Sequence, residues 1–174
     1  MELRYINPFA LDLNVGFEYN KVISELPNDC YAVLRDHDTL LFPGSGNHIP
    51  AIIEANPQFD LITCLTNRVG VGLHCVPGMF DVDSILEHQN KAAELWQLYG
   101  TETIATGVAP GFCMIFHKRV WERVGGFKEN SIFFDREFSN AVRKFGKIGL
   151  AKGLYIFHSY RMGKDKKDIS HLMK

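Results

Sequence analysis

The chain has 174 residues and a formal net charge of −1, with 46% hydrophobic and 22% charged residues. This composition is ordinary for a globular protein and argues against disorder, and the length suits one domain with a substantial core. Because the charge is near neutral, the chain carries no general positive field. We therefore expect neither nucleic acid nor an anionic membrane surface as a partner.

The sequence contains no targeting or membrane signal that we can identify. No stretch approaches the ~20 apolar residues of a membrane span. The first six residues lack the charged and then apolar profile of a signal peptide. The four cysteines are scattered without a CxxC pair, which favours free thiols. These patterns predict a cytoplasmic protein with no transmembrane segment.

Short apolar runs alternate with amphipathic segments along the chain. In chain order we expect a strand at Leu3–Ile6, a helix at Phe17–Leu26, a strand at Cys30–Leu34, a helix at Ile49–Asn56, a strand at Leu61–Leu65, a helix at Val82–Tyr99, a strand at Phe112–Phe116, a helix at Lys118–Val124, a helix at Asp135–Phe145 and a strand at Leu154–Phe157. Proline or glycine bounds most of these segments. The alternation predicts an α/β fold with a mixed, mainly parallel sheet flanked by helices. We expect one compact domain over residues 1–174, ending in a short basic tail that contains Lys164, Lys166 and Lys167.

Two aspartates, Asp36 and Asp38, follow directly after the buried strand predicted at Cys30–Leu34. Two carboxylates one residue apart are costly to hold together without a cation. A divalent ion removes that cost, and oxygen ligands suit Mg²⁺ or Mn²⁺. Such an ion can also bridge a diphosphate and stabilise it as a leaving group. The alternative interpretation is a solvated acidic turn.

The segment between the first strand and the first helix contains Asp12, Asn14, Gly16 and Asn20. A glycine-containing turn that leads into a helix offers backbone N–H groups to an anion. Asp12 can accept a hydrogen bond from a ribose or a base, and Asn14 or Asn20 can order the turn. Capping of the helix by Asn14 is the competing interpretation.

A second acidic position, Asp135, follows three apolar residues at the start of a predicted helix. A carboxylate in such partly dry surroundings can act as a general base toward a substrate hydroxyl. Asp135 could instead cap its helix, with Glu137 placed favourably near the positive end of the helix dipole.

The last predicted strand ends in His158, followed by Tyr160 and Arg161. A histidine at a strand end can complete a metal site begun by the two aspartates, although a lone histidine is more often structural. The arginine can pair with phosphate oxygens and the tyrosine can stack on a ligand, or both can pack against the sheet edge.

Taken in order, these segments resemble the GT-A glycosyltransferases, in particular the inverting family 2 group and its small, minimal members. The resemblance rests on Asn14-Val15-Gly16…Asn20, Asp36-His37-Asp38, Gly111-Phe112-Cys113-Met114-Ile115-Phe116, Trp121-Glu122-Arg123-Val124-Gly125-Gly126-Phe127, Asp135-Arg136-Glu137-Phe138 and Gly153-Leu154-Tyr155-Ile156-Phe157-His158. It covers nearly the whole chain.

The resemblance implies a metal-dependent transferase that moves a sugar from a UDP-, GDP- or dTDP-sugar to a glycan or other hydroxyl acceptor. In that family the metal is Mn²⁺ or Mg²⁺. The resemblance implies that Asp36, Asp38 and His158 are its ligands here and that Asp135 is the base. The nucleotide-binding positions implied are Pro8, Asp12, Asn14, Gly16, Asn20, Asp36, Tyr160 and Arg161.

Two other functions remain open at the level of sequence. The family's usual acidic residue before the base is Phe134 here, and the segment before Asn14 is short. Both departures are compatible with a non-catalytic nucleotide-sugar-binding module. A nucleotidyltransferase ranks last, because no glycine-rich loop with a following basic residue is present to hold a triphosphate.

Overall fold

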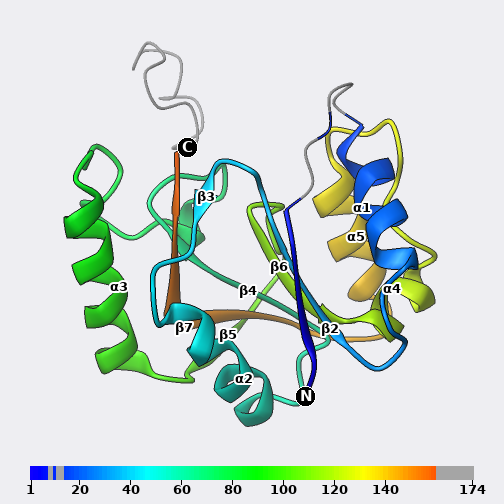
Figure 1. Ribbon diagram of the computed structural model, residues 1–174, viewed down its shortest axis with the longest axis horizontal. Helices are drawn as coiled ribbons and strands as arrows, with labels where there is room; N and C mark the ends of the chain where they lie inside the picture. The colour runs from blue at the N-terminus through cyan, green and yellow to red at the C-terminus, as the bar shows by residue number, and fades with distance from the viewer. Residues whose placement is uncertain (8–9, 11–13, 160–174) are drawn as a thin grey trace. The chain divides into compact units, whose positions relative to one another are not determined.

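The computed structural model describes residues 1–7, 10 and 14–159, which form a seven-stranded sheet and the helices that flank it (Figure 1). The strands are β1 (Leu3–Ile6), β2 (Tyr31–Arg35), β3 (Thr39–Leu40), β4 (Leu61–Thr66), β5 (Thr103–Thr106), β6 (Cys113–His117) and β7 (Ile148–His158). The helices are α1 (Val15–Ser24), α2 (Ser45–Ala55), α3 (Ile85–Tyr99), α4 (Lys118–Val124) and α5 (Phe134–Val142), with a 3-10 turn, η1, at Gly72–His74. None of the helices in this described part is both long and apolar enough to cross a membrane.

The sheet is mixed, with the order β1-β2-β6-β4-β7-β3 and with β5 paired to β7. β1 and β2 are parallel, whereas β2–β6, β4–β6 and β3–β7 are antiparallel. The α/β class and the mixed sheet are therefore confirmed, whereas the expectation that the sheet is mainly parallel is wrong. A continuous apolar run shows that both faces of a strand are covered, and helices provide that cover whichever way the neighbouring strand runs.

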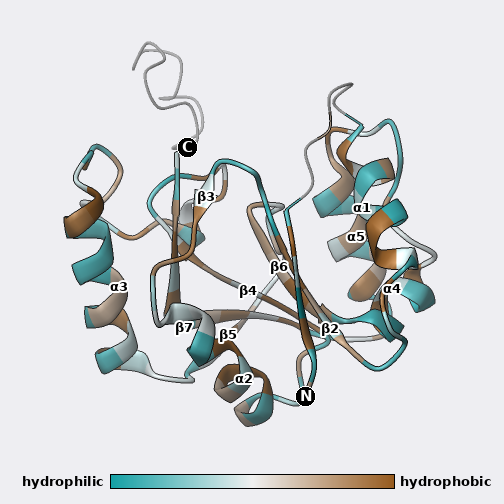
Figure 2. Ribbon diagram, in the orientation of Figure 1, coloured by the Kyte–Doolittle hydropathy of each residue, from teal (hydrophilic) through white to brown (hydrophobic). Residues whose placement is uncertain are grey.

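The chain divides into two compact units. Unit 1 comprises Met1–His37, Asn56–Thr63 and Ile104–Leu150. Its core joins α1, α4 and α5 to β2 and β6 through buried aromatic and aliphatic side chains. The ring of Phe127 stacks on Phe138 at 4.3 Å and also lies near Tyr19 and Phe134. Figure 2 shows hydrophobic and hydrophilic residues alternating around α1 and α5, as expected for helices with one buried face.

Unit 2 comprises Asp38–Ala55, Cys64–Thr103 and Ala151–Lys174, of which the structure describes residues up to 159. Its core contains Phe42, Ala92, Leu95, Tyr155 and Phe157. The buried ring of His88 joins this core to a loop, because Nδ1 lies 2.7 Å from the Tyr155 hydroxyl and Nε2 lies 2.9 Å from the Val82 carbonyl oxygen. His88 thus links α3 to β7 inside the core of unit 2.

Candidate metal centre

Asp36 and Asp38 lie in the short turn between β2, which ends at Arg35, and β3, which begins at Thr39. β3 pairs with the end of β7, so that Thr39 is opposite His158. The Ser159 N–H donates to the Asp38 carbonyl oxygen at 2.9 Å. These backbone contacts bring the imidazole of His158 to the carboxylate of Asp38, with Nε2 3.2 Å from Oδ1.

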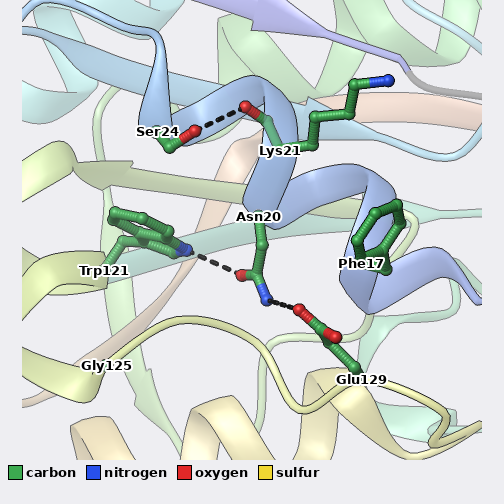
Figure 3. Close-up of a pocket in the computed structure, with 7 residues that line it drawn as sticks. All are labelled: Phe17, Asn20, Lys21, Ser24, Trp121, Gly125 and Glu129. Carbon is green, nitrogen blue, oxygen red and sulfur yellow. Dashed lines mark hydrogen bonds between the residues drawn. The ribbon is translucent and has the colours of Figure 1, made fainter.

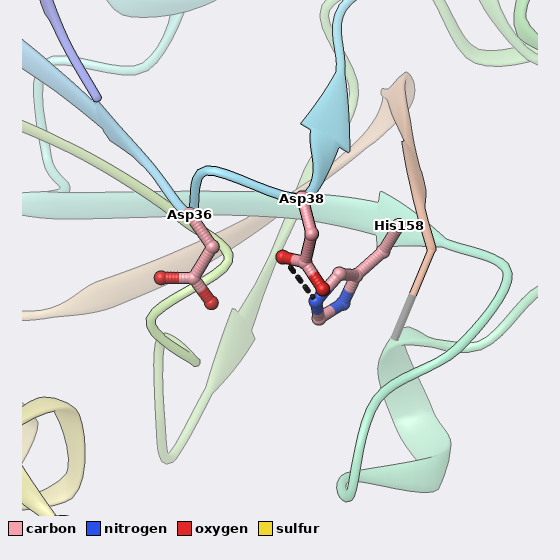
Figure 4. Close-up of side chains that lie close together, drawn as sticks. All are labelled: Asp36, Asp38 and His158. Atoms are coloured by element: carbon pink, nitrogen blue, oxygen red, sulfur yellow. Dashed lines mark ion pairs between the residues drawn. The ribbon is translucent and has the colours of Figure 1, made fainter. Parts of the chain in front are cut away.

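The side chains of Asp36, Asp38 and His158 converge (Figure 4). Each offers one ligand atom, and these atoms all lie within 4.8 Å of one another. Asp36 and Asp38 are half-buried and His158 is buried. The three residues predicted as metal ligands from the sequence therefore lie together, and that they bind a metal stays a prediction.

The imidazole of His158 is oriented by two contacts to the residues that follow β4. The His158 N–H donates to Oδ1 of Asn67 at 2.8 Å, and Nδ1 lies 2.8 Å from the carbonyl oxygen of Arg68. A carbonyl oxygen can only accept a hydrogen bond, so this contact requires a proton on Nδ1. Nε2 then faces Asp38 either as a lone-pair donor to a shared cation or as the second N–H of an imidazolium.

Asp36 receives a contact from Tyr19 of α1, whose side chain is 1% exposed. The Tyr19 hydroxyl lies 3.4 Å from Oδ1 of Asp36 and 3.4 Å from the carbonyl oxygen of Arg35. Burial, followed by the charge of Asp36, raises the pKa of Tyr19 well above its usual value. Tyr19 therefore keeps its proton and donates to Asp36.

Asp135 lies in the first turn of α5, but it does not cap the helix, because the N-cap position is Phe133. Oδ2 of Asp135 accepts from the Gly111 N–H at 2.9 Å, and Oδ1 accepts from the Arg136 N–H at 2.7 Å. Burial raises the pKa of Asp135, while these two N–H donors and the Arg136 charge oppose the rise. A carboxylate with a raised pKa is a stronger proton acceptor than an ordinary surface aspartate.

Gly111 allows this contact because it has no side chain. A Cβ at Gly111 would lie 2.8 Å from Cζ of Phe134 and 3.7 Å from Cβ of Asp135. Any larger residue would therefore require the ring of Phe134 to move. The charge of Asp135 also acts on Tyr19, so that within unit 1 this tyrosine lies near both Asp36 and Asp135.

Asn14 and Gly16 bind the start of α1 to the segment that precedes α5. Asn14 is the N-cap of α1, since its Oδ1 accepts from the Phe17 N–H, and the same oxygen accepts from the Asn130 N–H at 2.8 Å. A Cβ at Gly16 would overlap the carbonyl oxygen of Lys128. Helix capping by Asn14, the alternative interpretation, is confirmed.

Asn20 fixes the glycine-rich segment after α4 (Figure 3). Its Oδ1 accepts from Trp121 Nε1 at 3.0 Å and from the Phe127 N–H at 2.7 Å. Its Nδ2 donates to the Phe127 carbonyl oxygen at 2.8 Å and to Glu129 Oε1 at 3.2 Å. Asn20 also lines a surface pocket of about 420 Å³. The contacts of Asn20 with other residues thus go to the Trp121–Glu129 region.

The remaining predicted nucleotide-binding residues, Pro8, Asp12, Tyr160 and Arg161, lie outside the described residues. Two residues that contact the candidate ligands, Tyr19 and Asn67, were not identified from the sequence. Tyr19 has the spacing of an ordinary core residue of α1. Asn67 directly follows the buried strand β4, which is the same signal that identified Asp36 after β2.

No protein-family model and no curated protein matches the chain. Among solved structures, it is similar to the mannosyltransferase PcManGT from Pyrobaculum calidifontis in complex with GDP-Man and Mn²⁺, with a TM-score of 0.55 and 14% sequence identity. The match covers 87% of this chain and 38% of the mannosyltransferase chain. Our chain therefore spans well under half of that protein's length. The likeness shows that this protein has a glycosyltransferase-like fold.

Proposed function

We propose that this chain is a GT-A glycosyltransferase domain of the family 2-like type. It transfers a sugar from a nucleotide-diphosphate sugar to an acceptor hydroxyl, with inversion, and depends on Mn²⁺ or Mg²⁺. The observation that carries the proposal is the convergence of Asp36, Asp38 and His158 at strand ends in a glycosyltransferase-like fold. In α/β sheets, ligand-binding groups commonly gather at such strand ends.

The chemistry of the three side chains fits a divalent cation. Because Nδ1 of His158 contacts a carbonyl oxygen, a neutral imidazole presents the lone pair of Nε2 to the carboxylate of Asp38 at 3.2 Å. Two acceptors at that distance repel each other unless a cation or a proton lies between them. Carboxylate oxygens suit both proposed metals, and the imidazole nitrogen favours Mn²⁺ over the strictly oxygen-liganded Mg²⁺. When bound, such an ion stabilises the negative charge of the departing nucleotide diphosphate.

Asp135 is the proposed general base. Its raised pKa strengthens it as a proton acceptor, and the Gly111 N–H fixes the orientation of its carboxylate. Asp135 takes the proton of the acceptor hydroxyl while that oxygen bonds to the anomeric carbon. The bond to the nucleotide diphosphate breaks on the opposite side, and the configuration at that carbon inverts.

The proposed donor site draws on the residues that the family resemblance assigns to the nucleotide. They are Pro8, Asp12, Asn14, Gly16, Asn20, Asp36, Tyr160 and Arg161. The contacts of Asn14, Gly16 and Asn20 support an ordering role, since they hold the segment that leads into α5 and Asp135.

The test is metal-dependent turnover of GDP-, UDP- and dTDP-sugars, beginning with GDP-mannose because the structural neighbour was solved with it. We expect turnover with Mn²⁺, loss on adding a chelator, and loss in an Asp36→Ala, Asp38→Ala double variant. Glu54→Ala, at an exposed acid on α2, is the control and stays active. Activity that survives the double variant contradicts the proposal.

Asp135→Asn separates the transferase from a non-catalytic module. The proposal expects this variant to bind the donor and lose turnover. A nucleotide-sugar-binding module would give a different result. Its wild type would bind the donor without turnover on any acceptor tested, and Asp135→Asn would leave that binding unchanged. Release of pyrophosphate from a nucleoside triphosphate and a sugar phosphate would identify a nucleotidyltransferase.

A further inference from the structure

The dipeptide Asn67-Arg68, directly after β4, contacts His158 at two points. Oδ1 of Asn67 accepts from the His158 backbone N–H at 2.8 Å, and the Arg68 carbonyl oxygen lies 2.8 Å from Nδ1. We infer that Asn67 is a positioning residue that holds His158 with Nε2 directed at Asp38, and thereby sets the affinity for a divalent cation. The inference rests on the proposed function and deepens its metal site.

The position of the Asn67 amide is well defined by its partners. The side chain is 0% exposed, and Oδ1 accepts from both the His158 N–H and the Thr66 hydroxyl, the latter at 3.3 Å. Two donors on one atom identify that atom as the oxygen of the amide. Asn67 therefore presents its acceptor to β7 and has no freedom to turn its amide over without losing both bonds.

The Nδ2 amino group of Asn67 indicates that this residue does more than stabilise the fold. Nδ2 is buried and has no hydrogen-bond partner among the described residues. A buried donor without a partner costs free energy, which an apolar side chain would avoid. The benefit of asparagine here lies in its oxygen, and that oxygen contacts the candidate metal ligand.

Arg68 holds its own carbonyl oxygen in place by burying its side chain. Its Nε donates to the Phe80 carbonyl oxygen at 2.5 Å, and its guanidinium lies 5.1 Å from the centre of the Phe80 ring. The side chain is 5% exposed, and the Asp83 carboxylate lies 3.8 Å away. Because the Arg68 peptide group is held in place, its carbonyl oxygen keeps the proton of His158 on Nδ1. Nε2 of His158 remains the atom available to a metal.

A histidine ligand that is fixed before binding gives higher metal affinity, because less conformational freedom is lost on binding. Removing the Asn67 acceptor releases the His158 backbone N–H and loosens the end of β7. The imidazole then samples orientations in which Nε2 no longer faces Asp38. The expected consequence is weaker metal binding with little change in the rest of the fold.

The experiment measures Mn²⁺ binding to the full chain by electron paramagnetic resonance, without any nucleotide. Asn67→Leu removes the acceptor with a larger apolar side chain of the same branched shape, Asn67→Ala removes it with less bulk, and Asn67→Asp keeps it. Ser139→Ala is the matched control, because Ser139 is also 0% exposed and its hydroxyl oxygen accepts a backbone N–H, that of Ala109, at 3.0 Å.

We expect Asn67→Leu and Asn67→Ala to weaken Mn²⁺ binding by about 10- to 100-fold, as is usual for residues behind a metal ligand. Asn67→Asp retains binding, and Ser139→Ala loses stability but binds as the wild type does. Histidine-selective ¹⁵N NMR supplies a second readout. It shows the His158 proton on Nδ1 in the wild type and a mixture of tautomers in Asn67→Ala.

Two results overturn the inference in distinguishable ways. If the wild type binds Mn²⁺ and the folded leucine or alanine variant binds it equally well, Asn67 is not a positioning residue and the proposed function stands. If the wild type does not bind Mn²⁺, the metal-dependent function and the inference fail together. Should Asn67→Leu fail to fold, Asn67→Ala decides.

Discussion

Tyr19→Phe tests whether the buried tyrosine of α1 supports the candidate metal centre. The substitution removes only the hydroxyl, which lies 3.4 Å from Asp36 Oδ1 and 3.4 Å from the Arg35 carbonyl oxygen. The ring keeps its contacts with Phe127 and Phe134, whose centroids lie 5.5 Å and 5.7 Å away. The change therefore isolates one donor and leaves the core packing intact.

The size of the effect follows from the geometry. Both contacts are longer than the usual ~2.7–2.8 Å of a hydroxyl–oxygen hydrogen bond. Their combined contribution to the free energy of unfolding then falls at the low end, about 0.5–1 kcal/mol. For a chain of this size, that lowers Tm by about 1–4 °C. Because Asp36 loses a partner that orients it, we expect Mn²⁺ affinity to fall by about 10-fold, the low end for such partners.

Tyr155→Phe is the matched control for this experiment. Tyr155 is also fully buried, and its hydroxyl contacts His88 Nδ1 at 2.7 Å. Its removal leaves a buried ring nitrogen unsatisfied, at a cost of about 1–3 kcal/mol. Residues 155 and 158 point to opposite faces of β7, since side chains alternate along a strand. We therefore expect Tyr155→Phe to lose more stability than Tyr19→Phe and to keep its Mn²⁺ affinity.

The assay is Mn²⁺ titration by electron paramagnetic resonance beside thermal denaturation of both variants. We expect Tyr155→Phe to lose more thermal stability than Tyr19→Phe, and Tyr19→Phe to lose more Mn²⁺ affinity than Tyr155→Phe. Wild-type Mn²⁺ affinity in Tyr19→Phe would refute this expectation, and so would an equal loss of affinity in both variants.

Three further predictions concern pH and packing. Because burial raises the pKa of Asp135, turnover should rise with pH along an acidic limb centred above the ordinary ~3.9 of aspartate. The folded state then binds more protons than the unfolded state, so the stability of the wild type relative to Asp135→Asn should fall as pH rises through that interval. A limb at or below the ordinary value contradicts the assignment. Gly16→Ala places a Cβ against the Lys128 carbonyl oxygen, and urea denaturation should show a net loss of about 1–2 kcal/mol after the gain in helix propensity. A variant as stable as the wild type would show that the contact relaxes easily. Lys118→Met removes a buried ammonium that donates to Ser24 O, Leu26 O and Asn28 Oδ1, and the same assay should show a loss of about 1.5–3 kcal/mol. No loss would mean that apolar burial replaces these bonds fully.

Elements bounded by strong local signals were predicted accurately. β1 and α4 were predicted to the residue, because Asn7-Pro8 follows the first and Gly125 ends the second. Gly125 adopts a φ of 85°, the left-handed conformation that glycine favours at a helix end. Local chemistry alone determined these boundaries.

Several predicted bounds differ from the structure: α1 lies two residues earlier than expected, α3 begins three residues later and α5 ends three residues earlier. The two largest differences, in β7 and α2, arise because tertiary contacts override a local signal. The last strand was expected to begin after Gly153, but β7 runs from Ile148 to His158. Gly153 lies inside the strand, where the backbone of Gly100 approaches it closely. A Cβ at this position would overlap the Gly100 carbonyl oxygen, so the glycine marks a close backbone approach and not the start of a strand. α2 begins at Ser45 and continues through Pro50, which was expected near its start; the buried Ile49 and Ile52 stabilise it.

Two short strands, β3 and β5, could not be predicted at all. β3 has only two residues, and β5 is partly exposed, so neither has a periodic pattern. Both β3 and β5 form by pairing with β7, and this pairing is known only once the sheet order is known. The direction of the strands was missed for the same reason, since an apolar run does not record the orientation of its neighbour.

The candidate ligands were recognisable because each is a polar residue at the end of an apolar strand. That signal identified Asp36, Asp38 and His158, which the structure brings together. The same signal was present at Asn67, after β4, and was overlooked. The role of Tyr19 had no local signal, because a tyrosine on the buried face of α1 is indistinguishable from a packing residue until its neighbours are known.

The proposed ligands Asp36, Asp38 and His158 should bind one divalent cation together. The most direct measurement is the anomalous difference density of crystals grown with Mn²⁺. We expect one peak in contact with Nε2 of His158 and with a carboxylate oxygen of each aspartate, while Nδ1 still contacts the Arg68 carbonyl oxygen. No peak at this position, with Nε2 still directly against Asp38, would show that these three residues do not form a metal site.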